Sequence, residues 1–456
     1  MSATQLTILA AIVSYFVAMI IIGIMASRHQ SHSGFVIGSR DVGYIPTIGS
    51  LSSSFRDGMG VIFWVGFGAS VGYGGIWVFI GVVAALLVYA FIGPRARQLA
   101  AQQDYITIGE MIRARSGSLT ERFSAAIIVC FALMVIAIQL HVAGNLFSMV
   151  LGIAPWIGVF SVAIVVGFYL FWGGYSTVVK TDAVQFFIIL SLLFMPLFLE
   201  PTEAMFHFDT IWALETETII AFNLIGFFYV LSSADTWQRI FSARNTRVIY
   251  FSFPLSGVAL LIITLGLIFL GMLARPHLGE VIDTNTVFYE IFKGDYLSPL
   301  LQAYIAVVVM AICMSTLDTM CYLTAATIAK NHTPAHLTAT RDSYVNFSQK
   351  VMLLTLVAMS LVTLTISDLL LFAFSAASLL FILSPLYLFT VFNLPKVRND
   401  KTDRLMTLAI AMSAIIYLYM FSAGHFERAI LTLVPVAIST VLTSVAIYFG
   451  NINNQE

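Results

Sequence analysis

Apolar runs that are nearly free of charged residues follow one another along almost the entire chain. They lie near residues 6–26, 45–71, 75–96, 122–150, 155–173, 181–200, 216–240, 248–274, 297–329, 347–367, 369–394, 405–423 and 429–450. A helix of about 20 apolar residues spans the hydrocarbon core of a bilayer. The pattern therefore predicts an all-α membrane protein with about 13 transmembrane helices.

The second run is interrupted by polar residues in its first half. Ser50, Ser52, Ser53 and Ser54 precede Arg56, Asp57, Gly58 and Gly60. Each charge at this depth costs about 2.5–3.5 kcal/mol on insertion scales, and each glycine weakens a helix by about 1 kcal/mol. We therefore expect a broken helix whose free backbone groups face a polar cavity. Pairing of Arg56 with Asp57 is the structural alternative.

The ninth run carries oxygen-bearing side chains on one face. Ser315, Asp318, Thr319 and Tyr322 follow the i, i+3, i+4, i+7 spacing of a helix. Oxygen ligands suit hard cations, and an acidic residue deep in a span indicates a functional site. We expect a second set of ligands to converge on this face. The alternative is that the hydroxyls bond back to their own helix and that Asp318 lies near the membrane surface.

Three other runs carry isolated polar candidates. Asp182 opens the sixth run, where it would serve equally well as an ordinary helix cap. Gln139 and His141 lie in the fourth run, and a lone histidine among apolar residues is more often a packing residue than a ligand. In the seventh run, Ser233 and Asp235 interrupt the apolar pattern before a basic end.

Composition supports the membrane assignment and narrows the function. The 456 residues are 59% hydrophobic and 10% charged, whereas about 25% of a soluble domain is charged. A net charge of −1 gives no basis for a nucleic-acid partner, and the three cysteines lack metal-site spacing. The first run lacks the basic n-region of a signal peptide, so we expect a full span. No gap between runs would hold a catalytic domain, so we expect a protein that is not an enzyme.

Lys and Arg gather in alternate loops, whereas the intervening loops are acidic or glycine-rich. One basic loop follows the seventh run and holds Arg239, Arg244 and Arg247. The positive-inside rule places the basic loops in the cytoplasm. We therefore expect a multi-pass protein of the inner (plasma) membrane, with its N-terminus outside and its C-terminus in the cytoplasm.

Four polar or glycine-rich segments stand out. In order they are GFVIGSRDVGYIPTIGSLSSSFRDGMG, GGYSTVVKTDAVQ, WQRIFSARN and AICMSTLDT. They resemble segments of the sodium/solute symporters, which include bacterial proline, sugar and sialic acid carriers. The resemblance implies one LeuT-like transporter domain over residues 1–456, with two inverted five-helix repeats that each begin with a broken helix. The repeats would be 41–200 and 215–395, with an extra N-terminal helix in 1–40 and two extra C-terminal helices in 400–456.

The resemblance also implies ion and substrate sites, with the sodium ion as the coupling ion. A first sodium site would use backbone carbonyls of Phe55, Gly58 and Ile312 and the hydroxyls of Ser315 and Thr316. A second sodium site would use Asp182, Ser315, Asp318 and Thr319. The substrate-binding candidates are Arg56, Asp57, Gln139, Tyr229 and Ser233, and Tyr229 aligns with an inner-gate aromatic residue of the sugar carriers.

Arg56 departs from the family pattern, because related carriers have small residues there. An arginine favours a carboxylate or an amino acid over a sugar, since its guanidinium binds carboxylates through two parallel hydrogen bonds. We expect sodium-coupled symport of a small organic solute by alternating access, carried out by a monomer surrounded by membrane lipid.

Two alternatives to sodium symport stay open. One is a sensor or transceptor on the same fold that transports little, with Arg56 in the cation's place. Only GNINNQE follows the last run, so such a sensor would depend on a partner for its output. The other is a proton-coupled carrier that titrates at Asp57, Asp182 or Asp318.

Overall fold

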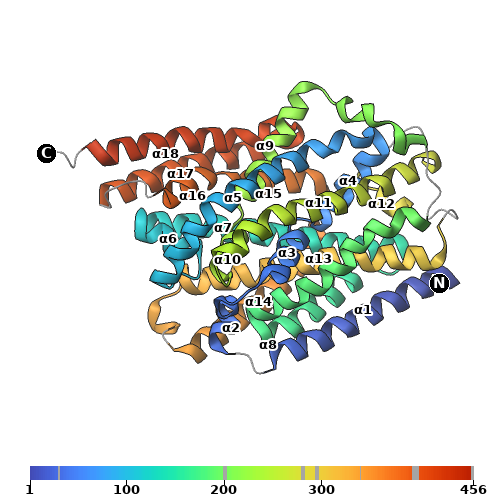
Figure 1. Ribbon diagram of the computed structural model, residues 1–456, viewed down its shortest axis with the longest axis horizontal. Helices are drawn as coiled ribbons and strands as arrows, with labels where there is room; N and C mark the ends of the chain where they lie inside the picture. Colours follow the sequence, from blue (N-terminus) through green and yellow to red (C-terminus); the bar gives the residue numbers. More distant parts are fainter. Residues whose placement is uncertain are drawn as a thin grey trace.

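The computed structural model describes residues 1–28, 31–198, 203–278, 283–292, 297–338, 340–392 and 400–452. Within them the chain is helical, apart from one isolated bridge between Val42 and Ala243. The α-helices are α1 (Ala3–Ser27), α2 (His32–Ile37), α3 (Tyr44–Ser54), α4 (Gly58–Val71), α5 (Ile76–Gln103), α6 (Ile108–Arg115), α7 (Ser118–Asn145), α8 (Pro155–Leu190), α9 (Thr216–Ser232), α10 (Ala234–Ser242), α11 (Thr246–Ala274), α12 (Val287–Glu290), α13 (Pro299–Thr327), α14 (Arg341–Val362), α15 (Leu369–Phe381), α16 (Ser384–Val391), α17 (Asp400–Ser422) and α18 (Val434–Ile452). Most of the long ones run along one axis of the molecule (Figure 1).

Ten helical segments of the described residues are long and apolar enough to cross a membrane. Two of them, Gly58–Gln103 and Pro155–Met195, are longer than a bilayer requires. An eleventh span arises if the bent pair α9 and α10 counts as one. The number of spans therefore depends on whether the two long segments turn back on themselves.

The first long segment turns at a glycine cluster between α4 and α5. Gly72 has a left-handed φ of 65°, which glycine adopts without steric cost. Gly75 then lies so close to α4 that a Cβ there would be 3.2 Å from the Trp64 ring. The turn Gly72–Gly75 before α5 thus packs against α4.

The second long segment turns inside α8, at Gly174, whose φ of 50° is also left-handed. Hydrogen bonds track its course along α1: from Gln5 to Val150 just before α8, from Lys180 to Ala26 after the turn, and from Gln185 to Tyr15 farther on. The chain therefore runs down α1 and back up, which agrees with separate spans at 155–173 and 181–200. Residues 199–200 of the second lie outside the described residues. The total of 13 spans stays a prediction.

Both interrupted runs are broken in the structure. In the second run, α3 ends at Ser54 and α4 begins at Gly58, with the Asp57 carboxylate capping α4 by accepting from Gly60 N–H at 2.6 Å. In the seventh run, α9 and α10 meet at Ser233 with a bend of 49°. The serine-rich interruptions therefore mark real breaks, where backbone groups leave the helical ladder.

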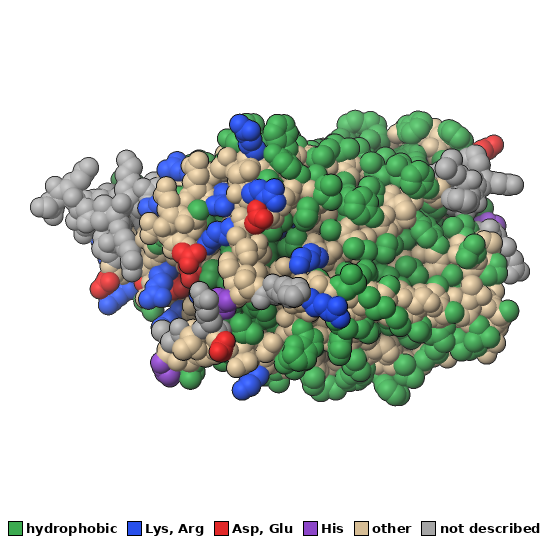
Figure 2. Space-filling view, turned by 60° about the horizontal axis from the view of Figure 1, so that its bottom comes forward, with side chains coloured by type: hydrophobic (Ala, Val, Ile, Leu, Met, Phe, Trp, Pro, Cys, Tyr) green, Lys and Arg blue, Asp and Glu red, His purple; other side chains and the backbone are tan. Residues whose placement is uncertain are grey.

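Charged side chains gather at one end of the molecule. Figure 2 shows Lys and Arg crowded at the end where Figure 1 places the C-terminus, while apolar side chains cover most of the rest of this face. One basic residue departs from the expectation. Arg239 does not belong to a loop, because α10 continues to Ser242 and carries the arginine into the interior, where it is 3% exposed.

Candidate ion and solute site

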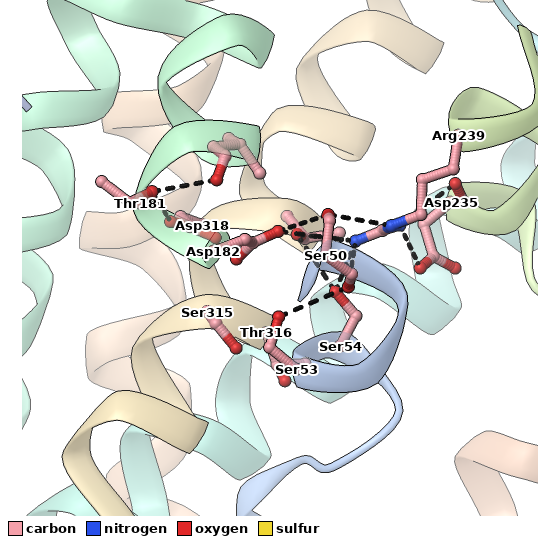
Figure 3. A network of polar contacts seen from close by, with 12 residues as sticks. Ser50, Ser53, Ser54, Thr181, Asp182, Asp235, Arg239, Ser315, Thr316 and Asp318 are labelled. Carbon is pink, nitrogen blue, oxygen red and sulfur yellow. Dashed lines mark hydrogen bonds and ion pairs between the residues drawn. The ribbon is translucent and has the colours of Figure 1, made fainter. Parts of the chain in front are cut away.

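The break in the second span lies against the middle of α13. A Cβ on Gly58 would be 2.9 Å from Sγ of Cys313, so only glycine permits this approach. At the other side of the break, Ser54 Oγ lies 3.4 Å from Thr319 Oγ1. Ser315 and Thr316 lie between Cys313 and Thr319 along α13, and Figure 3 shows them beside α3. The two segments that the first sodium site requires are therefore adjacent.

The hydroxyls of Ser315 and Thr316 are fully buried and weakly engaged. Both donate to the Ile312 carbonyl, at 3.4 and 3.3 Å respectively. As donors, the two hydroxyls therefore bond back to their own helix, as the structural alternative states. Hydrogen bonds of this length are weak, and a hydroxyl that donates its proton keeps its lone pairs for a cation.

The backbone of the break is partly engaged as well. The Phe55 carbonyl accepts from Nη1 of Arg56 at 3.1 Å. The Gly58 N–H donates to Oε1 of Gln139 at 2.6 Å, so this glutamine holds the beginning of α4 in place. No sequence pattern indicates that cap, because 81 residues separate the two partners.

Asp318 and Asp182 are buried near the same junction, and both have 0% exposure. Oδ2 of Asp318 accepts from Tyr169 Oη at 2.8 Å and from Thr181 Oγ1 at 3.3 Å. Oδ2 of Asp182 accepts from Ser50 Oγ at 2.5 Å. The Oδ1 atom of each carboxylate has no hydrogen-bond partner among the described residues. A buried carboxylate oxygen without a partner is costly, and a bound cation would satisfy it. Asp318, which the alternative interpretation places near the membrane surface, is fully buried inside the protein.

Arg239 joins this junction to α10, a role that the sequence analysis missed. Its Nη1 lies 2.6 Å from Oδ2 of Asp235, and its Nη2 lies 3.7 Å from Oδ2 of Asp182. Nε donates to Ser50 Oγ at 2.9 Å and Nη2 to Ser54 Oγ at 2.5 Å (Figure 3). The i, i+4 spacing of Asp235 and Arg239 was the available signal.

The charges of this network do not balance. It holds the carboxylates of Asp182, Asp235 and Asp318 but only one guanidinium, that of Arg239. If all are ionised, two negative charges are left over. Burial makes such an excess unfavourable unless cations or protons neutralise it, so the donor set fits sodium ions and leaves the proton-coupled alternative open.

A cavity of about 130 Å³ lies beside the same break. Its polar lining includes Arg56, Asp57 and Tyr229, and its walls are otherwise mostly apolar, with Trp64 and Phe131 among them. The Arg56 guanidinium carbon lies 5.2 Å from the centre of the Trp64 ring, within the range of a cation–π interaction. This cavity brings together three of the five expected substrate-binding residues.

The other two expected substrate residues lie elsewhere. Gln139 caps α4, as described above, and the Ser233 hydroxyl donates to Oδ1 of Asp235. Within the described part of the chain, no ion pair includes Arg56 or Asp57. Pairing of these two charges with each other, the structural alternative, is therefore not what the structure shows.

Comparison with known proteins agrees with this picture. Residues 35–199 match the sequence model of the sodium:solute symporter family. Sodium/proline symporters of Staphylococcus aureus strains JH9 and Newman are 23% identical over 351 residues, which cover 70% of this chain and 66% of theirs. The aligned part thus spans slightly less than two thirds of these relatives.

Solved structures resemble the whole fold. A Na⁺-coupled sialic acid symporter in a substrate-bound, outward-open state has a TM-score of 0.78 at 14% identity, covering 96% of this chain and 98% of that one. An Eremococcus coleocola manganese transporter has a TM-score of 0.58 at 12% identity, covering 91% and 95%.

The fold is that of a multi-pass helical membrane protein with the LeuT-type architecture of these solved structures. The matched segment and the curated relatives make the chain similar to the sodium:solute symporter family. The relatives named above are carriers.

Proposed function

We propose that the protein is a sodium-coupled symporter that moves a small carboxylate-bearing solute, such as an amino acid, across the plasma membrane. The observation that carries this proposal is the oxygen-rich face of α13 lying against the break in the second span. Alternating access would follow from rocking of the broken helices around the bound ion and solute. The breaks at both second and seventh spans support two inverted repeats, 41–200 and 215–395.

The first sodium ion would bind the carbonyls of Phe55, Gly58 and Ile312 and the hydroxyls of Ser315 and Thr316. All of these ligands are neutral, as suits a monovalent ion that must also leave. A second ion would bind Asp182, Ser315, Asp318 and Thr319. The partnerless Oδ1 atoms of Asp182 and Asp318 support this second position.

The solute would occupy the cavity beside the break. Arg56 supplies a buried positive charge for a carboxylate, and Asp57 and Tyr229 supply acceptor and hydroxyl groups nearby. The apolar walls favour a compact solute body. Proline and sialic acid, which appear in the names of matched carriers, both have a carboxylate.

Sodium would supply enough free energy for accumulation. One ion entering down 100 mV releases about 2.3 kcal/mol, and a tenfold concentration gradient adds about 1.4 kcal/mol. Together these correspond to several-hundred-fold accumulation of a neutral solute per ion.

Binding of radioactive sodium to the purified protein tests the ion site without knowledge of the solute. Removing two hydroxyl ligands, in a Ser315→Ala/Thr316→Ala variant, should weaken sodium binding roughly 5- to 30-fold, on the basis of about 1–2 kcal/mol for lost polar contacts. Thr324→Ala is the matched control, because its hydroxyl lies on the same helix but donates to Met320 O at 2.8 Å.

Unchanged sodium affinity in the double variant would refute the first site. Uptake into proteoliposomes, with sodium replaced by choline at fixed pH, distinguishes the proton-coupled alternative. Solutes for that assay come from a thermal-stability screen of amino acids, organic acids and sugars. Uptake that persists in choline and follows a proton gradient would assign the coupling to protons.

A further inference from the structure

Arg56 connects the solute cavity directly to a ligand of the first sodium site. We propose that Arg56 makes sodium binding depend on an anionic solute: without the anion its guanidinium holds the Phe55 carbonyl, and a bound carboxylate draws it away. The inference rests on the proposed function and adds that the solute must be an anion for its binding to strengthen that of sodium.

The Arg56 guanidinium is buried without a counter-ion. It is 3% exposed, and no carboxylate of the described residues forms an ion pair with it. Its Nη2 donates to Thr264 Oγ1 and its Nη1 to Phe55 O, while Nε has no hydrogen-bond partner in the described part of the chain. A buried cation with only neutral partners is costly, so the cavity that it lines favours an anion.

The Phe55 carbonyl is the point where the two sites meet. It lies at the C-terminal end of α3, where the break frees it from the helical ladder. A sodium ion that binds this oxygen would share it with a positive charge whose nitrogen is 3.1 Å away. Two positive charges that share one oxygen in a buried site repel each other, so Arg56 opposes sodium binding while its charge is uncompensated.

A carboxylate in the cavity removes this opposition in two ways. Its charge compensates the guanidinium, and its oxygens compete with Phe55 O for the N–H groups, because charge-assisted hydrogen bonds are stronger than bonds to a neutral carbonyl. The Phe55 carbonyl is then free to bind sodium. Solute and sodium consequently strengthen each other's binding by the same factor, as linkage requires.

Asp57, the next residue, attracts Arg56 electrostatically but forms no ion pair with it. Its Oδ1 accepts from the Gly60 N–H at 2.6 Å and its Oδ2 from Tyr229 Oη at 3.4 Å. Capping α4 therefore fixes this carboxylate away from the guanidinium, which leaves Arg56 available to the solute.

The decisive measurement is the affinity of the purified protein for radioactive sodium in the absence of any solute. Arg56→Gln should bind sodium about 5- to 150-fold more tightly than the wild type, the usual range of coupling between sites. Arg56→Lys should stay near the wild-type affinity, because it keeps the charge. Arg428→Gln is the matched control. The Arg428 side chain is 66% exposed and forms an ion pair with Glu217.

A second measurement adds butyrate as a carboxylate probe and butyramide as its neutral counterpart. Butyrate should strengthen sodium binding to the wild type, butyramide should not, and Arg56→Gln should show no response to either. Weaker or unchanged sodium binding in solute-free Arg56→Gln would overturn the proposal, as would a wild type that ignores butyrate. Absence of sodium binding both in the wild type with butyrate and in solute-free Arg56→Gln would instead refute the proposed function.

Discussion

Two buried arginines of this protein have the same exposure and opposite surroundings. Arg56 and Arg239 are each 3% exposed. Arg239 pairs with Asp235 at 2.6 Å, lies 3.7 Å from Asp182 and bonds to serines of α3. Arg56 has a threonine, a backbone carbonyl and the face of Trp64. Burial alone therefore does not separate a structural charge from a functional one; the presence of a counter-ion within the protein does.

The same distinction divides the carboxylates. Asp235 and Asp182 have Arg239 as a counter-ion, whereas the hydrogen-bond partners of Asp318 among the described residues are the hydroxyl groups of Tyr169 and Thr181. A charge that the fold compensates stabilises one arrangement of the helices. A charge that the fold leaves uncompensated is held ready for an ion or solute, at a cost in stability.

Removing Arg239 should have the largest effect. Arg239→Gln leaves Asp235 and Asp182 buried without their cation, and breaking a buried pair typically costs about 3–5 kcal/mol. We expect a marked fall in the melting temperature of the detergent-solubilised protein. The control is Arg244→Gln, whose arginine is 58% exposed and pairs with Asp41; exposed pairs contribute about 0–1 kcal/mol. Equal melting temperatures for the two variants would contradict a structural role for Arg239.

The helices and their breaks could be predicted from the sequence because the bilayer dictates them. A run of about 20 apolar residues has few alternatives to a spanning helix. The clusters from Ser50 to Gly60 and from Ser232 to Asp235 contradict that pattern locally, and both are broken in the structure. The turn at Gly174 was anticipated for the same reason, as a short polar gap between two apolar runs.

The partners of the site residues could not be predicted, because they come from distant segments. Thr264, which binds Arg56, is 208 residues away, and Ser50 is 189 residues from Arg239. The assignment of Arg239 to a basic loop was wrong for a related reason. Hydropathy shows where a helix loses its apolar character, but it does not show which way a charged side chain points.

The two unequal carboxylates should respond in opposite directions to neutralisation. In sodium-free buffer, Asp318→Asn should raise the melting temperature, because it removes a buried charge without a counter-ion. Asp182→Asn should lower it, since Arg239 loses one of its two carboxylates, with a cost of about 1–3 kcal/mol. Thermal unfolding with and without sodium measures both effects.

The stabilisation of the same two variants by added sodium provides a second measurement. A ligand at 100 times its dissociation constant stabilises a protein by about 2.7 kcal/mol, and both variants should lose most of the stabilisation contributed by a second sodium ion. If Asp318→Asn lowers the melting temperature as much as Asp182→Asn does, Asp318 belongs with the compensated charges.

The smallest effect is expected at Tyr229. Its substitution tests whether Asp57 is a carboxylate that the fold compensates or one that is held for an ion or solute. The Tyr229 hydroxyl is 3.4 Å from Oδ2 of Asp57, a long and weak hydrogen bond, while the cap to Gly60 is short at 2.6 Å. Tyr229→Phe keeps the edge-to-face ring contacts with Phe55 and Phe131. Tyr229→Phe should therefore lower the free energy of unfolding by no more than about 0.5–1.5 kcal/mol, with a correspondingly small change in melting temperature. Solute affinity should fall by only a few-fold. A loss of solute affinity beyond about tenfold, with stability unchanged, would mean that the hydroxyl binds the solute itself; a large loss of stability would mean that it compensates Asp57 for the fold.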